Sequence, residues 1–194
     1  MNFPSDMARA RCAHLSVAEL RLARTRLGVN QAQIDGPPHG MIVGEMPNGP
    51  SPGATPIPLF PFPASSSAGR LLSYSGLDPG MFLGRLLRRN LFPTHREWSA
   101  PAARERAREL RDELARLDGA FNVLLLGARV GVAFKVEGFF RRETFALGDH
   151  DVVVSCIPHP SGQNLLYNSA DVQRAAGAAV LWACGYSVNQ GATS

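Results

Sequence analysis

Cysteine is scarce in this chain, and lysine is almost absent. The 194 residues include three cysteines, Cys12, Cys156 and Cys184, which are odd in number and far apart. Such spacing excludes the disulfide framework of small secreted proteins, and three thiols cannot supply the four ligands of an iron–sulfur cluster. We therefore expect reduced thiols in a cytoplasmic protein that has no metal and no other cofactor.

Long apolar stretches are also missing. The chain contains no run of about eighteen apolar residues, which excludes a transmembrane helix. The first six residues, Met1 to Asp6, include no apolar segment of the kind found in signal peptides. We expect no membrane partner, and we expect the protein to act as a monomer.

Length and composition indicate one domain over residues 1–194. Apolar residues make up 45% of the chain, which is enough for a single core of ordinary size. Within this domain, residues 1–39 are expected to form a helical N-terminal region. Residues 47–66 are a proline-rich insertion, in which the seven prolines between positions 47 and 63 exclude regular structure.

Helical and strand patterns alternate along the chain. A capping box, Ser16 to Glu19, begins the first helix, and apolar residues three and four apart from Ala103 to Leu117 indicate an amphipathic helix. We expect helices at 16–27, 67–75, 78–87, 103–117, 128–135 and 169–184, and strands at 41–44, 90–92, 121–126 and 152–157. Short apolar strands separated by helices predict an α/β fold, a three-layer α/β/α sandwich around a four-stranded parallel sheet.

Two motifs directly follow predicted strands. The strand 152–157 leads into His159, which lies between Pro158 and Pro160, and the strand 41–44 leads into Glu45. Open α/β sheets bind ligands at the carboxyl ends of their strands, and flanking prolines restrict the backbone. The two side chains are therefore candidates for one functional site, although a histidine at a strand end and a carboxylate that caps a turn are the structural alternatives.

The two motifs, with the landmarks between them, resemble the uracil-DNA glycosylase superfamily. The likeness extends from about Gly40 to Gly185, and it is greatest to the branch whose first motif reads Gly-Glu-x-Pro-Gly. The matching segments are Gly44 to Pro47, Ala68 to Leu72, Gly76 to Asp78, Asn90, and His159 to Ser161. The chain departs from this branch in lacking its iron–sulfur cysteines. The resemblance also implies the three-layer fold and a DNA partner.

By this resemblance Glu45 and His159 are the catalytic residues. Hydrolysis of an N-glycosidic bond requires the nucleotide to be flipped out of the duplex. His159 would donate a hydrogen bond to O2 of the departing pyrimidine. Glu45 would stabilise the sugar cation and orient or deprotonate the attacking water. Asn90 can both donate and accept, so it would read the polar edge of the base; a plain turn residue is the alternative.

The remaining predicted pocket residues bear on the substrate. They are Gly44, Met46, Pro47, Asn48 and Phe62, with Phe62 preferred over Phe60 for stacking on the base and with packing of either ring in the core as the alternative. Met46 stands where relatives have Asp or Asn and cannot activate water, so the work falls to Glu45. Asn48 stands where uracil-strict enzymes place a tyrosine that collides with a C5 methyl group. A C5 substituent is therefore less strictly excluded.

DNA contacts are predicted in two places. An acid-free stretch supplies Arg85, Arg88 and Arg89 for phosphate binding, with a solvated surface as the alternative. The loop after His159 contributes Ser161, Gly162, Gln163, Asn164, Leu165, Leu166 and Tyr167. One of its last three residues would fill the hole left by the flipped nucleotide; packing under the following helix is the alternative.

The resemblance implies a DNA glycosylase, and we expect a monofunctional one that leaves an abasic site. Lys135 is the only lysine and lies away from the site motifs, so no amine nucleophile is expected. We favour a bulky C5-modified pyrimidine, such as a glucosylated hydroxymethyl base, as the substrate, and a role in defence against phage. Excision of uracil in DNA repair, non-catalytic binding of a modified base, and a small-molecule α/β enzyme remain the alternatives.

Overall fold

The computed structural model describes residues 17–29, 34, 37–46, 57–117, 121–147 and 150–187. In chain order the elements are α2 (Val17–Leu27), β1 (Gly40–Gly44), α3 (Ser67–Ser75), α4 (Pro79–Arg85), β2 (Leu86–Asn90), α5 (Ala100–Leu114), β3 (Phe121–Leu126), α6 (Ala128–Phe134), β4 (Arg142–Leu147), β5 (His150–Ile157), η2 (Leu165–Asn168) and α7 (Ala170–Ala183). Helices and strands alternate through most of these ranges, except that α4 follows α3 and β5 follows β4, and the ranges include a short 3-10 helix, η2.

The sheet has five strands in the order β2-β1-β3-β5-β4. The first four are parallel, as predicted, and β4 pairs with β5 in the antiparallel direction. The prediction of four strands was wrong because it omitted this edge strand. Along β4 exposed residues alternate with partly buried ones. An edge strand with so little buried apolar surface has only a weak sequence signal.

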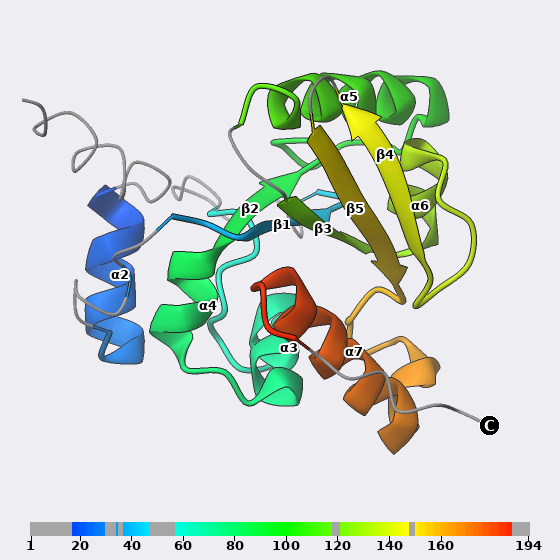
Figure 1. Cartoon of the computed structure of the whole chain (residues 1–194). Coiled ribbons are helices and arrows are strands. Elements are labelled where there is room, and N and C mark those ends of the chain that lie inside the picture. Colours follow the sequence, from blue (N-terminus) through cyan, green and yellow to red (C-terminus); the bar gives the residue numbers. More distant parts are fainter. Residues whose placement is uncertain are drawn as a thin grey trace, which may run out of the picture.

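Helices cover both faces of the sheet and so confirm the three-layer α/β arrangement (Figure 1). Successive residues of β1 serve opposite layers, because side chains alternate along a strand. Met41 and Val43 pack in the layer with α5 and α6, whereas Ile42 packs in the layer with α3 and α7. Helix α2 lies outside these layers and belongs to a third, smaller apolar cluster with Phe60 and Leu83.

One predicted helix ends earlier than expected, and the strand after it is displaced. The helix predicted over 78–87 ends at Arg85, and Leu86 begins β2, where the sequence predicted a strand at 90–92. Leu86 and Leu87 are apolar and buried, so they fit the spacing of a buried helix face and of a buried strand equally well. Pairing of Leu86 with Gly40 of β1 resolves that ambiguity.

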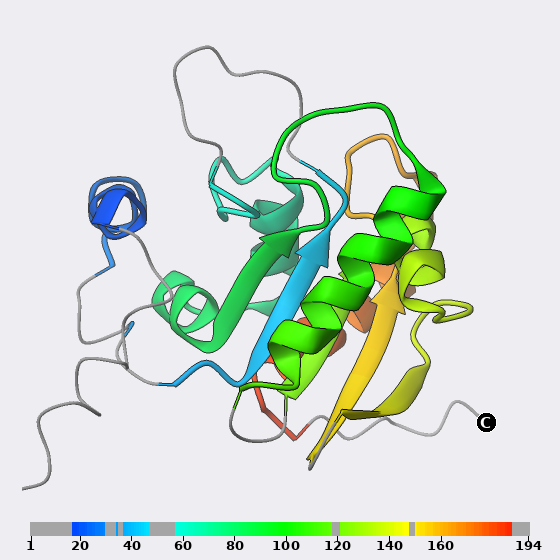
Figure 2. The same ribbon diagram turned by 90° about the horizontal axis from the view of Figure 1, so that it is seen from above.

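The parallel topology brings the candidate site residues to one edge. Gly44 and Asn90 are register partners at the carboxyl ends of β1 and β2, and Leu126 pairs with Ile157 at the ends of β3 and β5. Seen from above, the arrows of β1 and β2 point toward the same side of the molecule (Figure 2). In the described ranges no helix combines the length and the apolar character that crossing a bilayer requires.

Candidate active site

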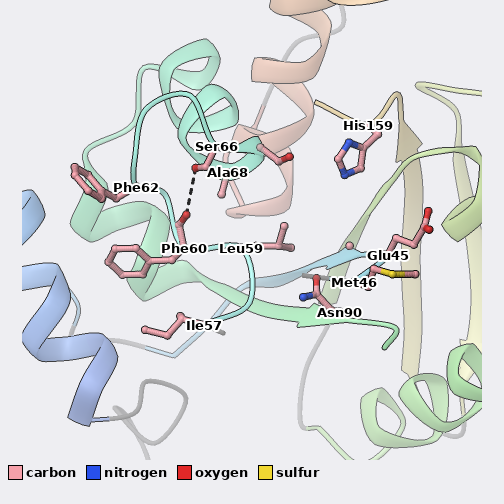
Figure 3. A pocket seen from close by; sticks show the side chains of 12 residues that line it. Glu45, Met46, Ile57, Leu59, Phe60, Phe62, Ser66, Ala68, Asn90 and His159 are labelled. Atoms are coloured by element: carbon pink, nitrogen blue, oxygen red, sulfur yellow. Dashed lines mark hydrogen bonds between the residues drawn. The ribbon is translucent and has the colours of Figure 1, made fainter. Parts of the chain in front are cut away.

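A cavity of about 220 Å³ opens at the carboxyl edge of the sheet. It joins the ends of β1, β2 and β5 to the loop that precedes α3 (Figure 3). Its lining residues are Gly44, Glu45, Met46, Ile57, Leu59, Phe60, Phe62, Ser66, Ser67, Ala68, Asn90 and His159. Six of the predicted site residues are therefore together, whereas the predicted Pro47 and Asn48 lie outside the described residues.

Gly44 permits a close approach at the end of β1. A Cβ atom at this position would lie 2.7 Å from Oδ1 of Asn90 and 3.3 Å from Cδ2 of Leu59. Any larger residue would push one of these two cavity residues away. Leu59 itself has a φ of 48°, a conformation that is strained for a bulky side chain. The surrounding packing thus holds Leu59 in the cavity wall.

The loop that carries His159 is fixed by hydrogen bonds from both sides. The Tyr167 hydroxyl donates to the Pro158 carbonyl at 2.7 Å, and Nδ2 of Asn164 donates to the His159 carbonyl at 2.9 Å. Tyr167 is also stacked on Tyr74, with ring centroids 5.5 Å apart. These contacts fix the backbone of His159 and so define the direction from which its imidazole enters the cavity.

Gly127 leaves room for the His159 side chain. A Cβ atom at Gly127 would lie 3.2 Å from the Cβ of His159, and Gly127 has a φ of 97°, which strains any other residue. Burial lowers the pKa of His159 below its ordinary value of 6.5, and the negative charge of Glu45 acts against this effect. The imidazole is therefore mainly neutral at pH 7, a state in which one ring nitrogen donates and the other accepts.

Glu45 is paired with an arginine that the sequence analysis missed. Nη1 of Arg129 donates to Oε1 of Glu45 at 3.2 Å, and the guanidinium also lies over the Trp98 ring, 5.5 Å from its centroid. Arg129 lies at the beginning of α6, just after β3. A charged residue soon after a predicted strand end was the available signal, because all such residues of a parallel sheet reach the same edge.

The opposite wall of the cavity comes from the loop before α3. Ser66 caps α3 by accepting from the Gly69 amide at 3.0 Å, and its hydroxyl donates to the Phe60 carbonyl at 3.4 Å, the bond drawn in Figure 3. Phe60 is buried beside α2, and Phe62 is exposed at the rim with Arg26 over its ring at 5.6 Å. Ile57, Leu59, Ser66, Ser67 and Ala68 complete the residues that sequence reasoning did not find.

The predicted DNA loop divides into exposed and internal residues. Leu165 and Leu166 are exposed, Leu165 the more so, whereas Tyr167 is buried and occupied by its bond to Pro158. Tyr167 is therefore excluded as the side chain that enters DNA. The Asn164 side chain forms hydrogen bonds within the loop, donating to the His159 carbonyl and accepting from the Leu166 amide. The turn between His159 and Asn164 includes Ser161, Gly162 and Gln163, which are partly or fully exposed.

The three predicted phosphate-binding arginines do not line the cavity. Arg88 is buried and pairs with Glu19 of α2 at 3.0 Å, so its prediction as a DNA contact was wrong. Arg89 pairs with Glu113 of α5 at 3.0 Å. Arg85 donates to the Cys184 carbonyl at 3.4 Å and lies over the Tyr186 ring. Side chains alternate along β2, so Arg88 and Arg89 point to opposite sides of the sheet and meet α2 and α5. Arg85, the last residue of α4, instead reaches the chain segment that follows α7.

Neither described cysteine is activated as a nucleophile. Cys156 and Cys184 are buried free thiols, and burial raises the pKa of each to about 12. Within the part of the chain that the structure describes, no three His, Cys, Asp or Glu side chains lie close enough together to hold a metal ion.

Comparison of the chain with models of known protein families and with curated proteins finds no match.

Proposed function

We propose that the protein is a monofunctional DNA glycosylase that acts on a flipped pyrimidine. One observation carries the proposal: Glu45, Asn90 and His159 come from the ends of three different parallel strands and line one cavity. The resemblance to the uracil-DNA glycosylase superfamily suggests a role for each of these three residues. Their place in one cavity supports those roles. A carboxylate to activate water, an amide to bind the base and a largely neutral imidazole to donate to it can together support hydrolysis of an N-glycosidic bond.

The reaction divides between the two sides of the cavity. His159 donates a hydrogen bond to O2 as the bond between the sugar C1′ and the base nitrogen breaks, and the electron pair leaves with the base. Glu45 faces the developing positive charge on the sugar. It accepts a proton from the water whose oxygen bonds to C1′. The released base then takes a proton from solvent.

Arg129 is a positioning residue in this scheme. Its hydrogen bond to Oε1 restricts the rotation of the Glu45 carboxylate. Asn90 holds the polar edge of the base, and the approach of its Oδ1 to Gly44 sets its place at the end of β2. Tyr167 positions the loop of His159 from outside the cavity. Leu165, as the most exposed side chain of its loop, is the residue we propose to fill the hole in the duplex.

The size of the cavity bears on the substrate. At about 220 Å³ it lies below the range of about 300–1,000 Å³ typical of pockets for drug-sized ligands, so it suits a single base. We propose that the base carries a C5 substituent, because Asn48 stands where uracil-strict enzymes of the superfamily that the chain resembles place a tyrosine. Recognition of such a substituent would fit a defence role against phage DNA, and uracil repair is the alternative.

A second candidate function is binding of a flipped base without hydrolysis. Met46 lies in the cavity where an acid would activate water, and Glu45 is held by Arg129. Turnover separates the two functions, because a binder releases no abasic sites. Duplexes with uracil, hydroxymethylated or glucosylated pyrimidines, incubated with the protein and then cleaved with alkali, report both the activity and the preferred base.

The decisive experiment removes the two proposed catalytic groups. Glu45→Gln and His159→Ala should each lower the single-turnover rate on the best duplex by about 10² or more. DNA affinity should persist, because phosphate contacts supply most of it. The control is Glu109→Gln, a carboxylate on the exposed face of α5, which should cleave at the normal rate. Near-normal cleavage by both site variants would remove the two residues from the mechanism.

A further inference from the structure

A second hollow, of about 190 Å³, lies between the first turns of α5 and α6. Apolar side chains form most of its surface, among them Trp98, Val132 and Ala133. Val132 is exposed although it is apolar. Two arginines, Arg104 and Arg129, complete the lining. Both helices begin at the carboxyl edge of the sheet (Figure 2). Their lining residues therefore place this hollow and the cavity at the same edge.

Arg129 connects the hollow to the cavity. The same guanidinium donates to Glu45 at 3.2 Å and lies over the Trp98 ring at 5.5 Å. The distance between the two spaces is therefore about the span of one side chain. Successive phosphates of a DNA strand are about 3.4 Å apart along the helix axis. A strand that delivers one nucleotide to the cavity would thus carry a neighbouring nucleotide past the hollow.

The chemistry of the hollow suits a nucleotide. An aromatic ring in an apolar wall offers a stacking surface for a base of any identity, and arginines bind the phosphates on either side of it. Arg96 adds an exposed positive charge nearby, because it lies over the ring of Phe92 at 4.8 Å, and the buried Phe92 ring meets Trp98 edge to face at 5.8 Å. Among the described residues, no acidic side chain lines the hollow.

We propose that this hollow holds a nucleotide next to the flipped one in the same DNA strand. Its base packs against Trp98 and Val132, and its phosphates meet Arg104 and Arg129. A guanidinium has five N–H donors, so Arg129 can hold a phosphate and Glu45 together. Binding of the strand thereby fixes the carboxylate that faces the sugar. This inference rests on the proposed function, since it assumes that the cavity receives a base from DNA.

The test pairs a change in the protein with a change in the DNA. In a Glu45→Gln background, affinity is measured by fluorescence anisotropy for a labelled duplex with one uracil mismatch. In matched duplexes, each neighbour of the uracil in turn becomes a tetrahydrofuran abasic residue. One such replacement should weaken binding roughly fivefold or more, the effect of losing one stacked base. The same replacement should have no further effect in Trp98→Ala, because the two changes remove one contact.

Arg104→Ala keeps the inference testable if Trp98→Ala does not fold. Loss of this phosphate contact should reduce the slope of log affinity against log salt by about one. Arg108→Ala is the matched control, because Arg108 is exposed on the same helix and pairs with Glu105 at 3.5 Å. It should bind as the parent does. Equal salt slopes for both variants would contradict a phosphate contact at Arg104.

Trp98 also offers a direct signal. The chain has two tryptophans, so Trp182→Phe leaves Trp98 as the only one, and the labelled duplex should quench its emission. Binding without quenching, or without coupling between Trp98 and any neighbouring base, overturns the inference while the proposed function stands. Quenching and coupling without excision support the hollow and count against the glycosylase. Absence of DNA binding overturns both.

Discussion

Two of the arginine–glutamate pairs in the described part of the chain have nearly equal lengths but differ in their exposure to solvent. Arg88 and Glu19 are 3.0 Å apart, and their side chains are 2% and 12% exposed. Arg129 and Glu45 are 3.2 Å apart, and their side chains are 62% and 24% exposed. The first pair joins α2 to the middle of β2, whereas the second lies at the strand ends, beside the cavity.

Burial decides what each pair can do. A buried arginine without its partner leaves a charge that water cannot reach, so such a pair is costly to break. An exposed pair contributes little to stability, about 0–1 kcal/mol, because water and salt screen both charges. The Arg88–Glu19 pair is therefore structural. The Arg129–Glu45 pair is free to serve a ligand, since its arginine can engage an incoming phosphate at small cost to the fold.

The largest expected effect comes from breaking the buried pair. Arg88→Ala should lower the free energy of unfolding by about 3 kcal/mol or more, because the ion pair between Arg88 and Glu19 is lost in a poorly solvated place. Urea denaturation followed by circular dichroism measures the change. Replacing both residues, Arg88→Met with Glu19→Leu, should recover most of the loss. A cost under about 1 kcal/mol for Arg88→Ala would show that the pair is solvated and that the comparison fails.

Arg129→Ala should give the reverse pattern. We expect a loss of stability of about 1 kcal/mol or less, since the Arg129 side chain is 62% exposed and water screens its charge. The single-turnover rate of base excision at saturating DNA should fall about tenfold, because the Glu45 carboxylate is no longer oriented. Arg106→Ala, an exposed arginine of α5 paired with Glu109, is the control. An unchanged rate in Arg129→Ala would show that Arg129 does not position Glu45.

The sequence predicted much of the fold because most strands are continuous apolar runs. Residues 121–126 were predicted with the bounds that the structure has, since no helical spacing competes there. The predicted position of β2 was displaced because Leu86 and Leu87 fit a helix and a strand equally well. β4 was missed because its residues are exposed or only partly buried, so it has no continuous apolar run. Local patterns of this kind carry no information about which element pairs with which.

The same distinction separates the site residues that were predicted from those that were not. Glu45 and His159 directly follow clear strands, so a rule about strand ends was sufficient to place them. Arg129 also follows a predicted strand, at the second position of α6, but nothing in its local sequence indicates that it pairs with Glu45, 84 positions away in the chain. Arg88 appeared to belong to an exposed basic run, and only the docking of α2 buries it. Tertiary contact, which spacing does not encode, decided both cases.

The smallest expected effect concerns the protonation of His159. Burial lowers the pKa of His159 below 6.5, and the negative charge of Glu45 partly opposes this. In Glu45→Gln the opposing charge is gone, so the midpoint of the His159 imidazole signals in an NMR titration should move to still lower pH. His39 is an internal control, because partial burial and the positive charge of Arg85 lower its pKa and Glu45 is not involved. Its midpoint should stay where it is.

The lowered pKa also has a consequence for stability. Between the folded pKa of His159 and about 6.5, the unfolded chain binds more protons than the folded one. The free energy of unfolding should therefore fall as the pH is lowered through this window, and His159→Asn should reduce that fall. The rate of excision should stay constant as the pH is lowered to this window and then fall, since the neutral imidazole is the proposed donor. A midpoint for His159 above 6.5 would mean that Glu45 outweighs burial and that the charged imidazole faces the departing base.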